Sequence, residues 1–186
     1  MTSERIWSVG HGARTAGAFV SLLRGAGIRR LVDVRTRPGS RRHPQFGQSA
    51  LASSLAEEGI AYRWEQDLGG FRTPRPDSAN TALRVEAFRG YADHMETETF
   101  ARALARLCED AGRDPTAFMC AETLWTDCHR RLIADALTIE GWEVVHLVEP
   151  GRREPHELHA ALRVRVLDGR LRYDAGGAEQ GRLDLG

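Results

Sequence analysis

The sequence predicts an α/β fold of three layers, in which helices cover both faces of a mainly parallel sheet and a short C-terminal β-hairpin is appended. Two observations predict this class. Short apolar runs alternate with longer segments whose apolar residues recur at helical spacing, and glycine follows most of those segments. Alternating strands and helices are typical of parallel sheets joined by right-handed crossovers. Asp168-Gly169, a dipeptide favoured in two-residue turns, predicts the hairpin.

Five apolar runs predict the strands of the sheet. They resemble strands buried on both faces, and they lie at residues 6–10, 28–34, 60–64, 116–120 and 143–148. The C-terminal hairpin is predicted at residues 164–173. We therefore expect one α/β domain over residues 1–150 and a tail over residues 151–186, with residues 150–157 as the connector.

Apolar spacing predicts four helices between these strands. Thr15 and Thr97 are residues that cap helix N-termini. The apolar faces are formed by Phe19, Leu22 and Leu23, by Leu51 and Leu55, by Phe100, Leu104 and Leu107, and by Leu132, Ile133 and Leu137. Residues 65–82 contain two adjacent glycines and two prolines, which favour a long active-site loop or a mobile lid.

Composition excludes several classes of function. The chain has 186 residues, and its 26 basic residues, all arginine, balance 26 acidic residues. A formal charge of zero provides no global attraction for nucleic acid or an anionic membrane, and a chain without lysine cannot form a Schiff base. Three cysteines do not form a disulfide framework, and no run of about 18 apolar residues is present to cross a bilayer. We expect a cytoplasmic protein without a cofactor or membrane association, and the sequence leaves its oligomeric state open.

Polar side chains follow three of the predicted strands at one edge of the sheet. His11 follows the first strand, Asp33 and Arg35 end the second, and Cys120 ends the fourth. Parallel α/β sheets bind ligands at the carboxyl ends of their strands, so these side chains are expected to line one concave site.

The helix after Cys120 begins with Cys128, His129 and Arg130, where free N–H groups and the helix dipole favour an anion. A thiol at that position should have a lowered pKa, so Cys128 is predicted to be more acidic than Cys120, which is desolvated at a strand end. The candidate catalytic residues are Cys120, Glu122, Cys128, His129 and His11. The candidate substrate-binding residues are Asp33, Arg35, Arg41, Arg42, Trp125 and Arg130.

Three functions fit these residues. The first is an enzyme that uses a cysteine thiolate on a small anionic or nucleotide-like substrate, by group transfer or hydrolysis. The alternative is a nucleic-acid or nucleotide binding module, in which arginines hold phosphate and Trp125 or Phe71 stacks on a base. The third is a redox-sensing cysteine pair.

Purely structural roles remain open for some of the same residues. Cys120 fits a small buried hydrophobe, and Asp33 with Arg35 fits a buried ion pair. No metal is expected, because the seven residues between the two cysteines exceed the usual zinc-ligand spacing of about two to four.

Several short motifs resemble those of a known family. They are Ser8-Val9-Gly10-His11, Leu31-Val32-Asp33-Val34-Arg35 with Ser40-Arg41-Arg42, Leu68-Gly69-Gly70, Gly90-Tyr91-Ala92-Asp93, and Met119-Cys120-Ala121-Glu122 with Cys128-His129-Arg130. Over residues 5–148 the chain is identified as a member of the domain of unknown function 488 family, which implies an α/β fold and a polar cluster without an assigned reaction. The resemblance adds Gly69, Gly70 and Tyr91 to the candidate substrate-binding residues.

Two departures limit what the resemblance implies. Gly12 stands where the family often has serine after Gly-His, which puts a hydroxyl contact there in doubt. The outline is also similar to rhodanese-like and cysteine-phosphatase domains, but Trp125 occupies the position where those domains close an anion-binding loop with arginine or an equivalent residue. Their activity is therefore not carried over.

Overall fold

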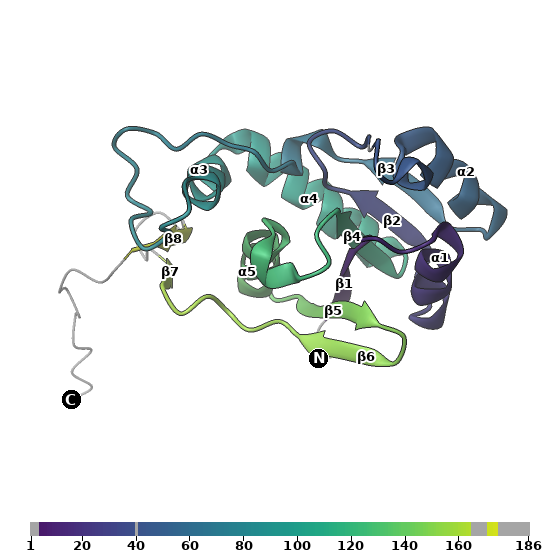
Figure 1. Ribbon diagram of the computed structural model, residues 1–186. Coiled ribbons are helices and arrows are strands. Elements are labelled where there is room, and N and C mark those ends of the chain that lie inside the picture. The colour runs from purple at the N-terminus through teal and green to yellow at the C-terminus, as the bar shows by residue number, and fades with distance from the viewer. Residues whose placement is uncertain (1–3, 40, 165–170, 175–186) are drawn as a thin grey trace, which may run out of the picture.

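Six strands form one sheet in the order β3-β2-β4-β1-β5-β6 in the computed structural model, which describes residues 4–39, 41–164 and 171–174 (Figure 1). The strands are β1 Arg5–Gly10, β2 Arg30–Asp33, β3 Ala61–Trp64, β4 Thr116–Cys120, β5 Glu143–Glu149 and β6 Arg152–Pro155. All neighbours from β3 to β5 are parallel, and β6 pairs antiparallel with β5. The predicted fold class is confirmed.

Among the described residues, five α-helices and three 3₁₀ turns connect the strands. They are α1 Ala16–Gly25, α2 Gln48–Glu57, α3 Glu86–Met95, α4 Glu98–Arg113, α5 Arg130–Ile139, η1 Pro44–Phe46, η2 Gln66–Leu68 and η3 Trp125–Asp127. The predicted caps are confirmed, since the hydroxyls of Thr15 and Thr97 accept hydrogen bonds from the backbone at the start of α1 and α4. Within the described residues, no helix has the length and apolar composition needed to cross a bilayer.

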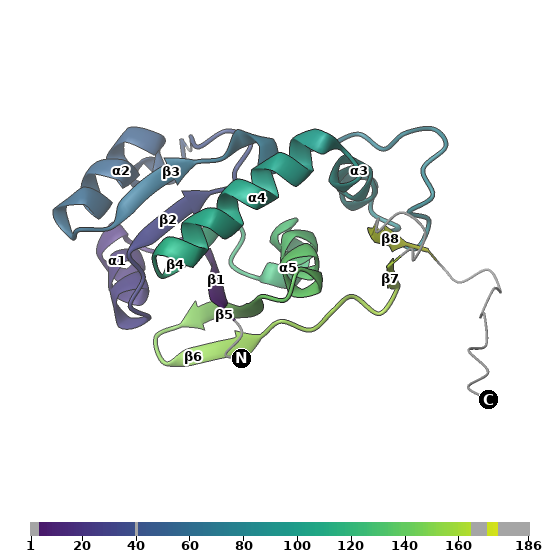
Figure 2. The ribbon, with the colours of Figure 1, turned by 180° about the vertical axis from the view of Figure 1, so that it is seen from behind.

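The helices form a layer on each face of the sheet, as expected. Side chains of α1 and α2 pack in one apolar cluster, and those of α4 and α5 pack in another, with α4 crossing the near face in Figure 2. Side chains of β4 alternate between them: Ala117 and Met119 belong to the first cluster, and Phe118 and Cys120 to the second. The side chain of Cys120 therefore lies on the α5 side of the sheet.

The carboxyl ends of β1 and β4 lie side by side where the chain changes direction across the sheet. After β1 the chain crosses to β2, on the far side of β4, whereas after β4 it crosses to β5, on the far side of β1. Because the two connections diverge, they leave a crevice between these strand ends, which is where doubly wound folds bind ligands. His11 and Cys120 lie at that crevice.

Two segments differ from the sequence-based expectation. Residues 150–157, expected to be a connector, contain β6, because main-chain hydrogen bonding to β5 extends the sheet by one antiparallel strand. Helix α3 lies in a region for which no helix was expected.

An antiparallel strand pair is present in the predicted hairpin region, as β7 Leu162–Val164 with β8 Leu171–Tyr173, and β7 begins two residues before the predicted start at residue 164. Its predicted turn, Asp168-Gly169, lies outside the described residues. The long loop before α3 is tied to the rest of the fold: the buried carboxylate of Asp93 accepts hydrogen bonds from the Arg75 amide, the Ser78 hydroxyl and the Asn80 side chain.

Candidate active site

A pocket of about 1070 Å³ opens at the carboxyl ends of the central strands. Eight residues proposed from the sequence line it, namely His11, Arg35, Arg42, Gly70, Cys120, Glu122, Cys128 and His129. The sequence therefore located the pocket through its topology, although Asp33, expected in the same concave site, lies beneath its surface.

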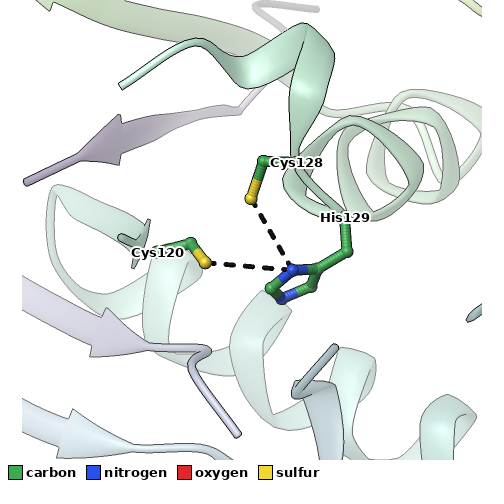
Figure 3. Close-up of side chains that lie close together, drawn as sticks. All are labelled: Cys120, Cys128 and His129. Carbon is green, nitrogen blue, oxygen red and sulfur yellow. Dashed lines mark hydrogen bonds between the residues drawn. The ribbon is translucent and has the colours of Figure 1, made fainter. Parts of the chain in front are cut away.

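Two thiols converge on one imidazole at the pocket floor (Figure 3). Nδ1 of His129 lies 3.8 Å from the sulfur of Cys120 and 3.6 Å from that of Cys128. Nε2 of the same ring lies 3.0 Å from the carbonyl oxygen of Val34. Because a carbonyl can only accept, Nε2 carries the proton in the neutral ring, and Nδ1 presents its lone pair to both thiols.

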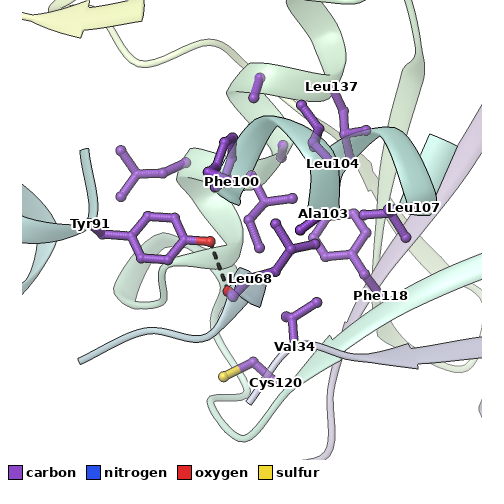
Figure 4. Close-up of a cluster of buried hydrophobic side chains, with 14 of the residues drawn as sticks. Val34, Leu68, Tyr91, Phe100, Ala103, Leu104, Leu107, Phe118, Cys120 and Leu137 are labelled. Carbon is purple, nitrogen blue, oxygen red and sulfur yellow. Dashed lines mark hydrogen bonds between the residues drawn. The ribbon is translucent and has the colours of Figure 1, made fainter. Parts of the chain in front are cut away.

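Close packing fixes the position of the His129 ring. A Cβ atom on Gly70 would lie 2.9 Å from Nδ1, so only glycine allows the chain to pass at this distance. The ring of Tyr91 lies 5.0 Å from that of His129, and its hydroxyl donates a 2.8 Å hydrogen bond to the carbonyl of Leu68 (Figure 4). Tyr91 was a candidate substrate-binding residue, but it is fully buried and does not line the pocket. It supports the His129 ring from the protein interior.

The environment makes the two thiols unequal. The pKa of the Cys128 thiol is lowered well below its usual value, because Cys120 donates a hydrogen bond to its sulfur and because His129 and Arg130 lie nearby. The same hydrogen bond, together with burial, raises the pKa of Cys120. This direction agrees with the expected order of acidity, which stays a prediction. Its main cause is the hydrogen bond from the neighbouring thiol. The expected cause, a place in the first helical turn, is not present, because α5 begins two residues after Cys128.

Arg130 is a buried cation that holds the loop between the two cysteines. It is 1% exposed and donates to the Ser8 hydroxyl at 2.9 Å and to the Glu122 carbonyl at 2.5 Å. Within the described part of the chain, its Nε has no hydrogen-bond partner. A Cβ on Gly10 would overlap the Glu122 carbonyl, so glycine there lets the loop cross β1. Arg130 therefore acts on the thiols from behind the pocket wall.

A buried ion pair orients the arginine at the pocket surface. Asp33 accepts from Nε of Arg35 at 2.9 Å, from Nη2 at 2.6 Å and from the hydroxyl of Tyr62 at 2.7 Å. Nη1 of Arg35 remains directed at His11 Nε2, 3.4 Å away. The structural role left open for Asp33 is thus the one its contacts describe, and Arg35 presents the charge to the pocket.

His11 is held in the neutral form. Its Nδ1 donates to the carbonyl of Gly12 at 2.8 Å, which leaves the Nε2 lone pair facing Arg35. Burial is the main cause that lowers the pKa of His11 to about 4. Of the two histidines proposed as proton carriers, His129 is therefore the one adjacent to the thiols and His11 supports Arg35.

The remaining candidates are spread around the pocket. Glu122 is exposed on its lining, whereas Arg41 is exposed outside it. Gly69 packs against Thr36, where a Cβ would lie 2.8 Å from the Thr36 Cα. Trp125 faces away, since its Nε1 donates to Glu154 at 3.0 Å and its ring stacks on His146 at 4.1 Å.

Sequence reasoning missed several lining residues. They are Thr36, His43, Val85, Ala87 and Phe88. His43 follows directly after the basic loop of residues 35–42, which was a usable signal. The last three flank the start of α3, a helix that was not expected, so no sequence signal connected them to the site.

The side chains of Cys120, Cys128 and His129 could together hold a metal ion. The sulfurs of Cys120 and Cys128 and Nδ1 of His129 all lie within 4.8 Å of one another, and His129 donates its other ring N–H to a carbonyl, as zinc-bound histidines do. The spacing argument against this set was wrong, because a strand end and a helix start bring the cysteines together regardless of the residues between them. That no metal is bound stays a prediction.

Comparison with known proteins identifies a domain but no activity. A family model described as "Domain of unknown function DUF488" matches residues 15–137. No curated protein and no solved structure matches the chain. The matched segment includes Arg35, Gly70, Cys120, Cys128 and His129, and it begins after His11.

Proposed function

The chain belongs to the DUF488 family, whose description names no reaction, and we propose that it is an enzyme in which the thiolate of Cys128 acts on a small anionic substrate. The observation that carries this proposal is the orientation of His129. Its Nε2 proton is fixed on Val34, so Nδ1 is free to take the thiol proton of Cys128 at 3.6 Å. A thiol, an adjacent base and a third group that orients the base form the general pattern of nucleophilic catalysis.

The surrounding groups favour the thiolate form. Cys120 donates to the Cys128 sulfur, and the buried charge of Arg130 lowers the pKa of the same thiol. These groups stabilise the negative charge of the Cys128 sulfur without forming a covalent bond to it. Cys120, with its raised pKa, remains a protonated donor at neutral pH.

The basic wall of the pocket supports an anionic substrate. Arg35, Arg37 and Arg42 line it, and guanidinium groups bind phosphate, sulfate or carboxylate with two parallel hydrogen bonds. Asp33 and the Phe46 carbonyl occupy Nε and Nη2 of Arg35 and hold the side chain in one orientation. Nη1, which faces His11, is the nitrogen that Arg35 offers to a ligand. Arg37 and Arg42 would supply the paired donors.

The reaction we propose is group transfer or hydrolysis through a covalent intermediate. The Cys128 thiolate forms a bond to the electrophilic atom of the substrate, and the bond to the leaving group breaks. The leaving group takes the proton from Nδ1 of His129. Water then attacks the intermediate, gives its proton to Nδ1 and releases the thiolate, so that the net reaction is hydrolysis, and another acceptor in place of water gives transfer.

The proposal places this chemistry in a reducing compartment such as the cytoplasm. The sulfurs of Cys120 and Cys128 lie within 4.8 Å of one another, and a thiolate with a second thiol beside it is susceptible to oxidation. A reducing compartment keeps both as thiols.

Alkylation of each cysteine at pH 7, followed by peptide mass spectrometry, tests the proposal. We expect Cys128 to react with iodoacetamide much faster than Cys108, a half-buried thiol whose pKa is raised to about 11 and which serves as the internal control. The His129→Ala variant should react at least tenfold more slowly at Cys128. Phosphate or sulfate should protect Cys128 in the parent protein.

The Cys120→Ser and Cys128→Ser variants assign the reactive thiol. Retention of the fast-reacting thiol in Cys128→Ser would contradict the assignment. Equal rates at Cys108 and Cys128 would contradict the thiolate itself, whatever the substrate.

A further inference from the structure

The pocket has two walls of different chemistry. One follows β1 and β2 and carries the positive charge of Arg35, Arg37 and Arg42, with His43 and the neutral His11 beside them. The other is apolar and flanks the start of α3, and it is formed by Phe71, Val85, Ala87 and Phe88. Two walls of this kind match a ligand that is anionic at one end and flat and apolar at the other.

We propose that the substrate is a nucleoside monophosphate, with its phosphate on the arginine wall and its base stacked on Phe71. This inference rests on the proposed function, because it names the substrate of the Cys128 centre. It adds a base-binding platform that the thiolate chemistry does not require.

Phe71 is the residue on which the inference depends. Its side chain is 92% exposed, and its φ of 55° is in the left-handed region, which bulky residues avoid. A large apolar ring in water beside a strained backbone contributes little to folding. Such features concentrate at ligand sites, where the ligand covers the exposed ring.

The backbone before Phe71 is fixed, so the point at which its side chain leaves the main chain is fixed. Three successive carbonyls accept side-chain hydrogen bonds: Leu68 from Tyr91 at 2.8 Å, Gly69 from Arg72 at 3.1 Å, and Gly70 from Thr36 at 2.8 Å. A main chain held in this way loses little conformational entropy when a nucleobase stacks on the ring.

The same segment connects the platform to the catalytic centre. Gly70, the residue before Phe71, packs directly against the His129 ring. A nucleobase on Phe71 would therefore lie one residue from Gly70. The contact of Gly70 with His129 orients the imidazole that acts as general base for Cys128. Substrate binding and thiolate activation share this stretch of chain.

The size of the pocket argues against a simple inorganic anion. Its volume of about 1070 Å³ is at the upper end of the range for small-molecule sites. A phosphate or sulfate ion would contact the arginine wall alone and leave the apolar wall in water. A nucleotide covers both walls.

The charge distribution favours a mononucleotide over a nucleic-acid strand. Strand binding depends on a basic surface that follows many phosphates, whereas this chain has equal numbers of basic and acidic residues. The arginines that line the pocket, Arg35, Arg37 and Arg42, provide for one phosphate group.

Protection of Cys128 from iodoacetamide tests the inference with AMP, ribose 5-phosphate and inorganic phosphate as probes. We expect AMP to protect at a concentration roughly 5- to 150-fold lower than ribose 5-phosphate, because stacking of one base on an aromatic ring has this effect on affinity. Phe71→Ala should abolish the difference between the two probes. Phe71→Trp should keep it, and its fluorescence should be quenched by AMP.

Leu158→Ala is the matched control, since Leu158 is an exposed apolar residue outside the pocket. It should leave the preference for AMP unchanged. Equal protection by AMP and ribose 5-phosphate would overturn the nucleotide inference, while protection by any of these anions would leave the proposed function standing.

Two further outcomes separate the proposals. Tighter protection by a single-stranded oligonucleotide than by AMP, with a steep loss in salt, would overturn the mononucleotide in favour of nucleic acid. A Cys128 that reacts no faster than Cys108 would instead overturn the proposed function.

Discussion

Gly70 and His129 are in contact in a way that no other residue at position 70 allows. A Cβ atom on Gly70 would lie 2.9 Å from Nδ1 and 3.3 Å from Cε1 of the imidazole. Nδ1 is also the atom that faces the two sulfurs. The backbone at Gly70 therefore forms one side of the slot that directs the His129 lone pair at the thiols.

The Gly70→Ala substitution should displace the His129 ring and slow alkylation of Cys128 by at least tenfold at pH 7, because the base loses its position relative to the sulfur. Gly17→Ala is the matched control: a Cβ at Gly17 meets no atom within 4 Å, and alanine in helix α1 should raise stability by up to about 1 kcal/mol. Alkylation quenched at a series of times and followed by mass spectrometry gives the rate at Cys128 in each variant. A wild-type rate in Gly70→Ala would show that the ring position does not matter.

Arg130→Met should shift the pH profile of Cys128 alkylation to higher pH. The buried charge of Arg130 lowers the pKa of this thiol, so its removal raises the pKa and cuts the rate at pH 7 roughly tenfold. Arg131→Met is the control. The Arg131 guanidinium lies over the Trp125 ring, 6.0 Å from its centroid, and its removal should leave the pH profile of Cys128 alkylation unchanged. Identical profiles for parent and Arg130→Met would contradict the electrostatic role.

The sequence predicts the sheet well because each buried strand is a short apolar run. The strand that ends at Cys120, β4 Thr116–Cys120, was expected with the same bounds that the structure has. The placement of His11 and Cys120 at one crevice also follows from topology alone, since parallel strands bring their carboxyl ends together.

Helix α3 escaped prediction although its apolar residues have helical spacing. Phe88, Tyr91, Ala92 and Met95 recur at i, i+3, i+4 and i+7. However, the residue at the N-cap is Val85, whose side chain cannot cap, and the helix follows a long irregular loop. A capping residue was therefore absent in this helix although the periodicity was present.

The orientation of Trp125 could not be read from the sequence, because it depends on β6. The indole N–H donates to Glu154, which lies on this strand, and residues 150–157 were expected to be a connector. A single missed strand thus produced two errors in expectation. The hydrogen bond that the Val34 carbonyl accepts from His129 also could not be predicted, because every residue has a backbone carbonyl and the sequence does not show which one the imidazole meets.

Stability should fall as the pH is lowered from about 6.5 towards 4, in part because His146 must stay neutral. Burial lowers the pKa of His146 to about 2, below the ordinary 6.5, so the unfolded chain binds the additional proton between these values. The stabilisation is complete above about pH 6.5 and is lost as the pH decreases. One such proton changes the unfolding free energy by at most about 1.4 kcal/mol per pH unit.

Urea unfolding between pH 7 and 4.5 measures this slope, and His146→Phe should flatten it. Phenylalanine keeps a ring to stack on Trp125, 4.1 Å away in the native protein, but does not titrate. An unchanged slope in His146→Phe would assign the pH dependence to other groups.

Chelation should not alter the reactivity of Cys128. If the Cys128 thiol is free, as the proposed function requires, EDTA leaves its alkylation rate at pH 7 unchanged, and purified protein contains far less than one zinc per chain. Elemental analysis of the protein purified without added metal is the measurement. Stoichiometric zinc that is lost in Cys120→Ser, with a thiol that reacts only after chelation, would make the three clustered donor atoms a metal site and overturn the free thiolate.

Asp33→Asn should destabilise the fold strongly and weaken anion binding at the same time. Asp33 is fully buried and accepts three hydrogen bonds from Arg35 and one from Tyr62. Asparagine leaves the buried guanidinium without a counter-charge, which costs about 3–5 kcal/mol when one partner of such a pair is removed. Urea unfolding should show a lower midpoint with an unchanged slope.

Tyr62→Phe separates the two effects of Asp33, because it removes one hydrogen bond from the carboxylate but keeps the ion pair with Arg35. It should cost less, about 1.5–3 kcal/mol for a hydrogen bond to a charged group, and leave phosphate protection of Cys128 intact. Asp33→Asn should reduce that protection, since Arg35 is no longer held towards the pocket. Loss of protection in Tyr62→Phe as well would mean that general destabilisation, and not the orientation of Arg35, controls anion binding. Equal stability of Asp33→Asn and the parent protein would contradict the ion pair's structural role, whereas intact protection in a destabilised Asp33→Asn would show that Arg35 binds the anion without it.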